Sequence, residues 1–384
     1  MNNQKRKICF VVTSHIHYSR SKLVLEMLRD DERIELQIVI GGSAILPNYG
    51  DVEDTLQKDG FNHDAKITMN FEGGSHVAMA KTTGIGVSEF ATVFDSLKPD
   101  IVVIRGDRHE VISPAIAAAY LNIPIAHIEG GDVTGTIDES VRHAVTKFSH
   151  IHFATNEEAA RRIVRMGEDP RYVFNVGCPA VEYIARNDFQ ASHELVNRLG
   201  VGDVVDIEKP FLMVMNHPVT TETSRNQENT EILLQAVHDL HIPTIWFWPN
   251  VDAGTDSISK AIRIFREKRD PHHMRFHKYL PTGEFIGLLK KTICLVGNSS
   301  VGIKECSYLG VPVVNVGSRQ NRRMRAENVI DAPFDKEQIQ GAIRQQIQNG
   351  QYPQSTIYYQ DGTSKKIADI LSTINLYTQK QFCD

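Results

Sequence analysis

The chain has 384 residues, a formal net charge of −5, and hydrophobic and charged contents of 41% and 23%, values typical of a soluble protein with two ordinary domains. The acidic balance argues against a nucleic-acid partner, and no apolar run approaches the roughly 20 residues that span a bilayer, so no membrane partner is expected. The five cysteines are widely spaced and form no C-x-x-C pair. We therefore expect reduced thiols in a cytoplasmic protein.

Strands and helices are predicted to alternate through the first half of the chain. The short apolar runs predict strands over Lys7–Thr13, Ile34–Ile40, Ile101–Ile104, Ile125–Ile128, His152–Ala154 and Val173–Val176. The amphipathic or Ala-rich stretches between them predict helices over Ser21–Leu28, Val77–Leu97, Glu110–Leu121 and Glu157–Met166. This alternation is typical of a parallel sheet covered by helices.

The alternation restarts after the polar segment Arg186–Glu208. Strands are predicted over Phe211–Met215, Thr244–Trp248, Met274–Tyr279, Ile293–Val296 and Val311–Val316, and helices over Glu228–Leu240, Ser257–Lys268, Gly283–Lys290 and Gly302–Leu309. We therefore expect an α/β protein with two Rossmann-like doubly wound domains, residues 1–185 and 186–360, and a cleft between them. A C-terminal helix and tail, residues 361–384, are expected to pack back on the first domain.

Three carboxylates are expected at one edge of the first sheet. Asp107 and Glu129 follow the strands Ile101–Ile104 and Ile125–Ile128, and Asp138 opens the next helix. Ligands of open α/β sheets bind beyond the carboxyl ends of the strands. Carboxylates that meet there should raise one another's pKa, as proton-transfer chemistry often requires.

Each of these residues also has a simpler interpretation. Asp107 is explained about equally well as a helix N-cap, and Asp138 as a solvated partner of Arg142 four residues on. The two glycines after Glu129 are explained by a tight turn. Glu129 itself is harder to explain in this way, because a carboxylate directly after a buried strand has little capping value.

The second half carries a candidate phosphate site. His217 lies in a loop after Phe211–Met215, because Pro218 cannot continue a central strand; a lone His is nevertheless more often structural. The small residues Gly297–Gly302 open a helix, whose free N–H groups and the hydroxyls of Ser299 and Ser300 suit a phosphate. An ordinary Ser N-cap, worth about 1 kcal/mol, is the alternative.

Two further side chains complete this predicted nucleotide site. Glu305 falls within the same predicted helix and is suited to accept hydrogen bonds from a ribose diol, and Arg319 follows the next strand and is suited to a diphosphate. The chain has neither a P-loop nor a G-x-G-x-x-G loop after a strand, which argues against a P-loop NTPase and a dinucleotide oxidoreductase. No His/Cys cluster has the spacing of metal ligands.

Six motifs together carry a resemblance to a known family. The segments GDR, HIEGGDVTGTIDESVRHAVTK, NHPVT, FWPNVDAG, GNSSVGIKE and NVGSRQ occur in this order. The chain thereby resembles the hydrolysing UDP-N-acetylglucosamine 2-epimerases, which start sialic acid synthesis in bacteria and form the epimerase half of a bifunctional animal enzyme. The resemblance runs from about Ile8 to the segment YYQDGTSKKIADIL.

The resemblance implies a fold, a reaction and an assembly. The fold is the two-Rossmann (GT-B) fold of nucleotide-sugar glycosyltransferases. The substrate is UDP-N-acetylglucosamine (UDP-GlcNAc), and the products are UDP and N-acetylmannosamine (ManNAc). The family further suggests a homodimer. The chemistry requires no redox cofactor and no metal.

The resemblance also implies roles for individual residues. The implied catalytic residues are Asp107, Glu129, Asp138 and His217. The implied substrate-binding residues are Arg108, Arg142, Asn250, Ser299, Ser300, Glu305 and Arg319. The chain departs from the family at one point. The family's first strand usually ends in a Thr-x-Arg motif, and that Arg is absent here. Here His15, His17 and Arg20 are the candidates to replace it, so the exact nucleotide sugar is left open.

The implied reaction explains the need for several titrating groups. Anti elimination of UDP gives 2-acetamidoglucal, and water then adds across its double bond, so one proton is taken from C2 and another returned. Two other hypotheses stay open. One is the same reaction on a related nucleotide sugar, a UDP-2,4-diacetamido-2,4,6-trideoxyhexose of the legionaminic acid pathway or GDP-GlcNAc. The other is a glycosyltransferase or a nucleotide-sugar sensor with the same fold.

Overall fold

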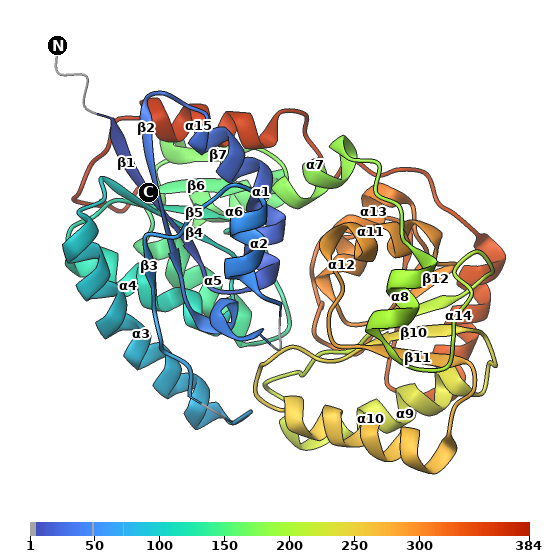
Figure 1. The fold of residues 1–384 in the computed structure, drawn as a ribbon. Helices are drawn as coiled ribbons and strands as arrows, with labels where there is room; N and C mark the ends of the chain where they lie inside the picture. The colour runs from blue at the N-terminus through green and yellow to red at the C-terminus, as the bar shows by residue number, and fades with distance from the viewer. Residues whose placement is uncertain (1–4, 48–49, 72) are drawn as a thin grey trace.

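The computed structural model describes residues 5–47, 50–71 and 73–384 and contains two α/β domains (Figure 1). The strands of the first domain are β1 (Arg6–Val12), β2 (Ile34–Ile40), β3 (Ala65–Lys66), β4 (Ile101–Arg105), β5 (Ile125–Ile128), β6 (Ile151–Ala154) and β7 (Val173–Asn175). Its helices are α1 (His15–Arg29), α2 (Val52–Lys58), α3 (His76–Leu97), α4 (Ile112–Tyr120), α5 (Ile137–Phe148), α6 (Glu157–Arg165) and α7 (Pro179–Arg186), with short 3-10 turns η1 (Gly42–Ile45), η3 (His109–Val111) and η4 (Pro170–Tyr172).

The second domain repeats the same plan. Its strands are β8 (Val201–Gly202), β9 (Leu212–Met215), β10 (Thr244–Phe247), β11 (Met274–His277), β12 (Cys294–Gly297), β13 (Val313–Val316) and β14 (Val329–Ala332). Its helices are α8 (His193–Leu199), α9 (Asn226–His238), α10 (Thr255–Arg269), α11 (Thr282–Lys291), α12 (Ser300–Ile303), α13 (Glu305–Leu309) and α14 (Lys336–Asn349), with the 3-10 turn η5 (Thr223–Arg225). The last helix of the chain is α15 (Thr363–Thr373).

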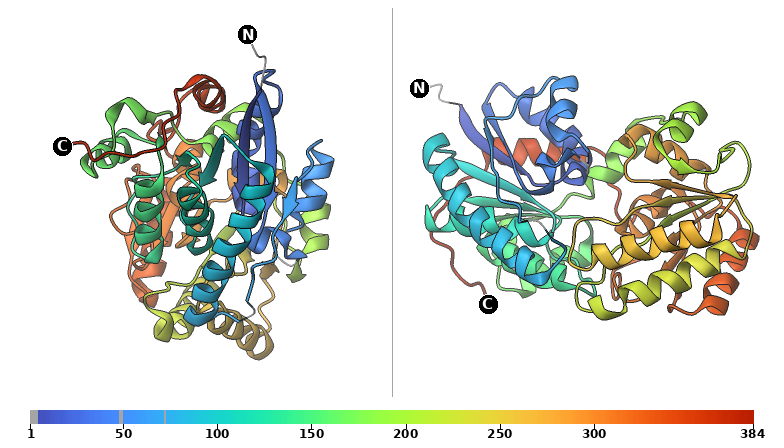
Figure 2. Two further views of the ribbon diagram at one scale, coloured as in Figure 1. Left: turned by 90° about the vertical axis from the view of Figure 1, so that its left-hand side faces the viewer. Right: turned by 60° about the horizontal axis from the view of Figure 1, so that its bottom comes forward.

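Both sheets are doubly wound, which confirms the predicted fold class. The strand order is β3-β2-β1-β4-β5-β6-β7 in the first sheet and β14-β13-β12-β9-β10-β11-β8 in the second. All described strand pairs are parallel except the short edge pair β11–β8. The order reverses direction between β1 and β4 and between β12 and β9. Ligands bind at such switch points, and the two domains lie side by side with these regions between them (Figures 1 and 2).

The strands form because their apolar side chains are buried on both faces of the sheet. In β4, Ile101 and Val103 join the core on one face, whereas Val102 and Ile104 join the core on the other. All four are at most 1% exposed, and burying a Val or Ile side chain stabilises a fold by about 1.5–3 kcal/mol. The continuous β-branched run that predicted a central strand is therefore explained by its two-sided burial.

Several predicted boundaries are wrong for local reasons. Helix α1 begins at His15 rather than near residue 21, because the Ser14 hydroxyl accepts a hydrogen bond from the His17 backbone N–H and caps it. The helix predicted from Gly302 to Leu309 is broken at Lys304 into α12 and α13. Strand β14 and helix α14 were not predicted.

Helix α15 returns to the first domain after the second is complete. It contacts α1 and α7, and Ile367 and Leu371 are fully buried in the core that contains β1. Figures 1 and 2 show it in red beside the blue N-terminal strands. Across the described ranges, no helix has both the length and the apolar character needed to cross a membrane.

Candidate active site

Glu129 occupies an unusual backbone position at the end of β5. Its φ is +73°, a conformation that costs a residue with a side chain of order 1–3 kcal/mol and that is found often at functional sites. The carboxylate is bound by Arg105 at 2.7 Å and by the Cys178 thiol at 3.1 Å, and the Lys304 ammonium lies 3.5 Å away. Burial alone would raise the pKa of Glu129, but Arg105 and Lys304 outweigh it and hold that pKa well below its usual value.

Asp107 follows β4 and binds Arg142 of α5. The Arg142 Nε lies 3.1 Å from Asp107 Oδ2, and Nη2 donates to the same oxygen. The N-cap interpretation of Asp107 is wrong, because the following turn η3 is preceded by Arg108 and has no side-chain cap. Burial alone would raise the pKa of Asp107, but the guanidinium groups of Arg142 and Arg323 outweigh it and keep that pKa below its usual value.

Asp138 is the carboxylate with the highest proton affinity of the three. It lies in the first turn of α5, where the Thr136 hydroxyl caps the helix by accepting from the Asp138 backbone N–H. Its carboxylate lies 3.6 Å from Nη2 of Arg319, which belongs to the second domain. Burial and the negative charge of Asp107 raise the pKa of Asp138 to about 6. The simple i,i+4 interpretation is wrong, because Arg142 binds Asp107 instead.

One small cavity contains all three carboxylates, and its wall is polar and formed by both domains. The residues that line it are Arg20, Asp107, Glu129, Thr134, Asp138, Ser300, Lys304, Arg319, Gln320 and Arg323. Negative groups from the first domain thus face mainly positive groups from the second. Such a cavity suits a reaction that develops positive charge on a sugar ring and negative charge on a leaving group.

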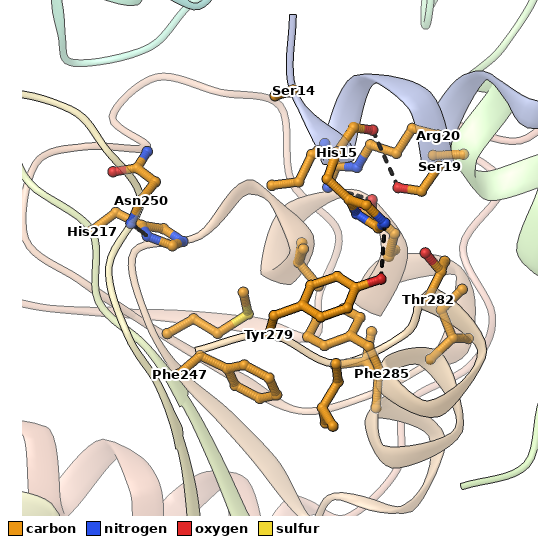
Figure 3. Close-up of a pocket in the computed structure, with 18 of the residues that line it drawn as sticks. Ser14, His15, Ser19, Arg20, His217, Phe247, Asn250, Tyr279, Thr282 and Phe285 are labelled. Carbon is orange, nitrogen blue, oxygen red and sulfur yellow. Dashed lines mark hydrogen bonds and ion pairs between the residues drawn. The ribbon is translucent and has the colours of Figure 1, made fainter. Parts of the chain in front are cut away.

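A second, largely apolar pocket lies beside this cavity and shares Arg20 with it. Figure 3 shows Tyr279, Phe247 and Phe285 along its wall, with the Tyr279 hydroxyl 3.0 Å from Nε2 of His15. Aromatic and aliphatic side chains of this kind suit a planar heterocycle.

His217 and Asn250 lie together at the edge of the apolar pocket (Figure 3). The Asn250 backbone N–H donates to Nδ1 of His217 at 3.3 Å, which leaves the ring proton on Nε2 as a donor. Burial and the positive charge of Arg319 lower the pKa of His217 to about 3. His217 is therefore a neutral donor at physiological pH rather than a cation. The Asn298 side chain fixes the loop by accepting from the His217 backbone N–H at 2.7 Å.

Among the three residues proposed to replace the usual Arg, only Arg20 reaches both pockets. His15 binds Tyr279, and His17 binds the Thr13 hydroxyl at 2.9 Å. Arg20 forms an ion pair with Glu305 of the second domain. Glu305 is therefore engaged by a cation in this structure and lies in α13, not in the helix that follows β12.

The remaining predicted site residues differ in which of the two pockets they line. Ser300 lines the carboxylate cavity, whereas the Ser299 hydroxyl caps α12 by accepting from the Val301 N–H. Arg108 lines the apolar pocket and binds Glu110 at 2.7 Å and Asp252 at 3.2 Å. Half of the twelve predicted residues thus line the carboxylate cavity, whereas Arg108, together with His217, Asn250 and Glu305, lines the apolar pocket.

Four charged residues of the site were not selected from the sequence: Arg105, Asp132, Lys304 and Arg323. Arg105 was hidden because it ends an otherwise apolar strand, where it is 2% exposed. Asp132 and Lys304 lie inside motifs that carried the resemblance, so a search for every charged residue in those motifs would have found them. The remaining residue, Arg323, carried no local signal beyond its place in an Arg-rich segment.

Comparisons with known proteins identify the family of the chain. A model of the UDP-N-acetylglucosamine 2-epimerase family matches residues 26–372. A UDP-N,N'-diacetylbacillosamine 2-epimerase (hydrolyzing) of Legionella pneumophila is 34% identical over 97% of both chains. A GDP/UDP-N,N'-diacetylbacillosamine 2-epimerase (hydrolyzing) of Campylobacter jejuni is 29% identical over 86% of this chain and 85% of the other.

A solved structure shares the architecture. The crystal structure of UDP-GlcNAc 2-epimerase from Neisseria meningitidis bound to UDP-GlcNAc superposes with a TM-score of 0.76, covering 96% of this chain and 99% of that chain at 15% identity. This likeness establishes the predicted GT-B-like arrangement of the two domains. The family model that matches residues 26–372 and the relative that is 34% identical over 97% of the chain show that the chain belongs to the UDP-N-acetylglucosamine 2-epimerase family.

Proposed function

We propose that the protein is a hydrolysing 2-epimerase that converts a UDP-linked 2-acetamido sugar and water into UDP and the free C2-epimeric sugar. One observation carries the proposal: three carboxylates of the first domain, one buried and two half-buried, face the cations of the second in one cavity, beside an apolar pocket. The cavity suits the reacting sugar carbons, and the pocket suits a uracil ring. The diphosphate would then lie near the shared edge, within reach of Arg319 and the Nε2–H of His217.

The first step is the elimination of UDP. Asp138 accepts the C2 proton, because it is the strongest base of the three carboxylates and a pKa near the working pH favours proton transfer. The electron pair of the C2–H bond forms the C1=C2 double bond, and the C1–O bond breaks with its electrons moving to the diphosphate. The ionised Asp107 and Glu129 stabilise positive charge on the ring, while Arg319 and His217 stabilise the departing diphosphate.

The second step is hydration of the glycal. A water oxygen bonds to C1, and the double-bond electrons take up a proton at C2 on the face opposite to that of the departed proton. That water keeps one hydrogen in the new C1 hydroxyl and gives its other proton to the site, where it replaces the proton delivered to C2, so the two steps together consume one water per sugar. The product is inverted at C2, and no oxidant or reductant is needed.

The relatives favour one substrate among those that this chemistry allows. Two of them, at 34% and 29% identity, are named for diacetylbacillosamine, so a UDP-2,4-diacetamido-2,4,6-trideoxyhexose is the first candidate. The second is UDP-GlcNAc, which the description of the family model supports. Conversion of UDP-GlcNAc to ManNAc, the reaction that starts sialic acid synthesis, is therefore proposed second.

Incubation of the protein with each nucleotide sugar in heavy water tests the proposal. We expect UDP release without an acceptor, and a free sugar, identified by NMR, that is inverted at C2 and carries deuterium there in every molecule. Faster turnover of UDP-GlcNAc than of the diacetamido sugar would reverse the order of substrates. Product that retains its original C2 hydrogen would contradict the elimination route and favour simple hydrolysis or sugar transfer.

A further inference from the structure

Asp132 connects more charged groups of the site than any residue assigned a role above. It lies three residues after Glu129 and is 3% exposed. Its backbone carbonyl accepts from Nη1 of Arg142 at 2.9 Å. Its Oδ2 atom lies 3.2 Å from the Lys304 ammonium and 3.4 Å from Nη2 of Arg323, and its Oδ1 atom accepts from Asn156 at 3.2 Å. Asp132 is nevertheless not among the residues that line the carboxylate cavity.

The two cations that reach the Asp132 side chain belong to the other domain. Lys304 lies at the break between α12 and α13, and Arg323 lies in the loop after β13. They are 2% and 6% exposed, and burying such ions costs several kcal/mol each unless they are paired. Their pairing with Asp132 exists only when the two domains are together.

The backbones of the two domains also meet at this point. The Gly135 N–H donates to the Arg319 carbonyl at 3.1 Å. A Cβ atom at Gly135 would lie 2.1 Å from the Ser318 carbonyl oxygen, so a larger residue would force the loops apart. The loop of Asp132 is therefore held directly against the loop of Arg323.

We propose that Asp132 is a positioning residue for the elimination–hydration reaction, because it holds the second domain in register with the Arg142–Asp107 pair. This inference rests on the proposed function. The carbonyl of Asp132 orients the guanidinium that fixes Asp107, and its carboxylate fixes the two cations of the facing wall. Asp132 thereby sets the distance between the carboxylates that act on the sugar and the groups that hold the diphosphate.

The Asp132→Asn variant tests this role, because an amide keeps the size and the backbone carbonyl but loses the charge that holds Lys304 and Arg323. A misplacement of about 1 Å can cost about 10²-fold in rate, so we expect kcat to fall by about that factor. UDP affinity, measured by calorimetry, should change much less. Because the closed site should also become looser, more glycal should escape per UDP released than in the wild type.

Glu168→Gln is the matched control. Glu168 is also 2% exposed and is bound by two lysines, Lys147 and Lys380, each at 2.6 Å. None of these residues lines the carboxylate cavity. We expect this variant to keep the wild-type kcat and the wild-type ratio of glycal to UDP.

A double variant separates positioning from general loss of structure. If Asp132 acts through Lys304, Asp132→Asn combined with Lys304→Met should cost less in kcat than the product of the two single losses. Independent losses, or an Asp132→Asn variant with the kcat and glycal ratio of Glu168→Gln, would overturn the inference. Should Asp132→Asn fail to fold, Lys304→Met is compared with Lys147→Met in the same assays. A lower kcat and a higher ratio of glycal to UDP in Lys304→Met would support the inference, and equal values in the two variants would overturn it. A wild-type protein that releases no UDP would instead refute the proposed function.

Discussion

Asp138 offers the sharpest test of how the cavity works, because its pKa lies close to physiological pH. If ionised Asp138 accepts the C2 proton, activity is present above its pKa of about 6 and is lost as the pH falls through that value. At pH 5 only about one molecule in ten would keep the ionised form, and kcat/KM should fall about tenfold for each further pH unit. In the Asp138→Asn variant this fall in rate at acid pH, the acid limb of the pH profile, should disappear. The rate of the variant should also be about 10²–10⁴-fold lower than that of the wild type.

The position of the limb should respond to the neighbouring charge. Arg319 lies 3.6 Å from the Asp138 carboxylate, and at an effective dielectric constant of about 20 this separation corresponds to an attraction of order 4 kcal/mol. Both side chains are partly open to the solvent of the cavity, which reduces this figure. We therefore expect Arg319→Met to move the acid limb upward by about one pH unit or more.

The assay is the rate of UDP release across about pH 4.5–9, a range that extends to both sides of the pKa of Asp138. Glu139→Gln is the control, because Glu139 is the next residue on α5, binds the Thr134 N–H at 2.7 Å and does not line the cavity. The acid limb of the Glu139→Gln variant should stay near pH 6. An acid limb that persists near pH 6 in Asp138→Asn, or that does not move in Arg319→Met, would refute the assignment of Asp138 as the proton acceptor.

Two further predictions concern binding and stability. Arg319→Ala should weaken UDP binding by about 1.5–3 kcal/mol, the range for a hydrogen bond to a charged group; unchanged affinity by calorimetry would contradict a role at the diphosphate. Glu129→Gly relieves backbone strain of about 1–3 kcal/mol but leaves the Arg105 guanidinium buried without its main partner, which costs about 3–5 kcal/mol. The thermal unfolding temperature should therefore fall, and a rise would show that the strain outweighs the ion pair.

The local parts of the fold followed from the sequence because they depend on local pattern. The β4 and β5 strands were predicted to within a residue, since a short β-branched run between polar clusters has little alternative to a buried strand. The carboxylates at their ends were found for the same reason. Strand β14 was missed because its apolar run is short and is interrupted by the exposed Asp331, and Val329 and Ile330 are only partly buried.

The pairing of charges could not be predicted, because it depends on how segments distant in sequence, including segments of different domains, face each other in the folded chain. Arg142 was considered as a partner of Asp138 on the same helix, yet it binds Asp107, 35 residues earlier in the chain. Lys304 and Glu305 are neighbours in sequence, but the break between α12 and α13 directs one to Glu129 and the other to Arg20. No periodicity in a single sequence encodes these partners.

This division of charge between the domains explains why the site needs both of them. The first domain brings the carboxylates of Asp107, Glu129, Asp132 and Asp138 close together, and like-charge repulsion among them favours the uptake of protons. Against burial and this repulsion, Arg142 and Arg105 of the first domain act together with Lys304 and Arg323 of the second to lower the pKa of Asp107, Glu129 and Asp132, whereas that of Asp138 stays raised. Bringing the domains together thus does more than enclose the substrate. It separates the carboxylates into three that stay ionised and one that can exchange a proton near neutral pH, which is the division of roles that elimination and hydration require.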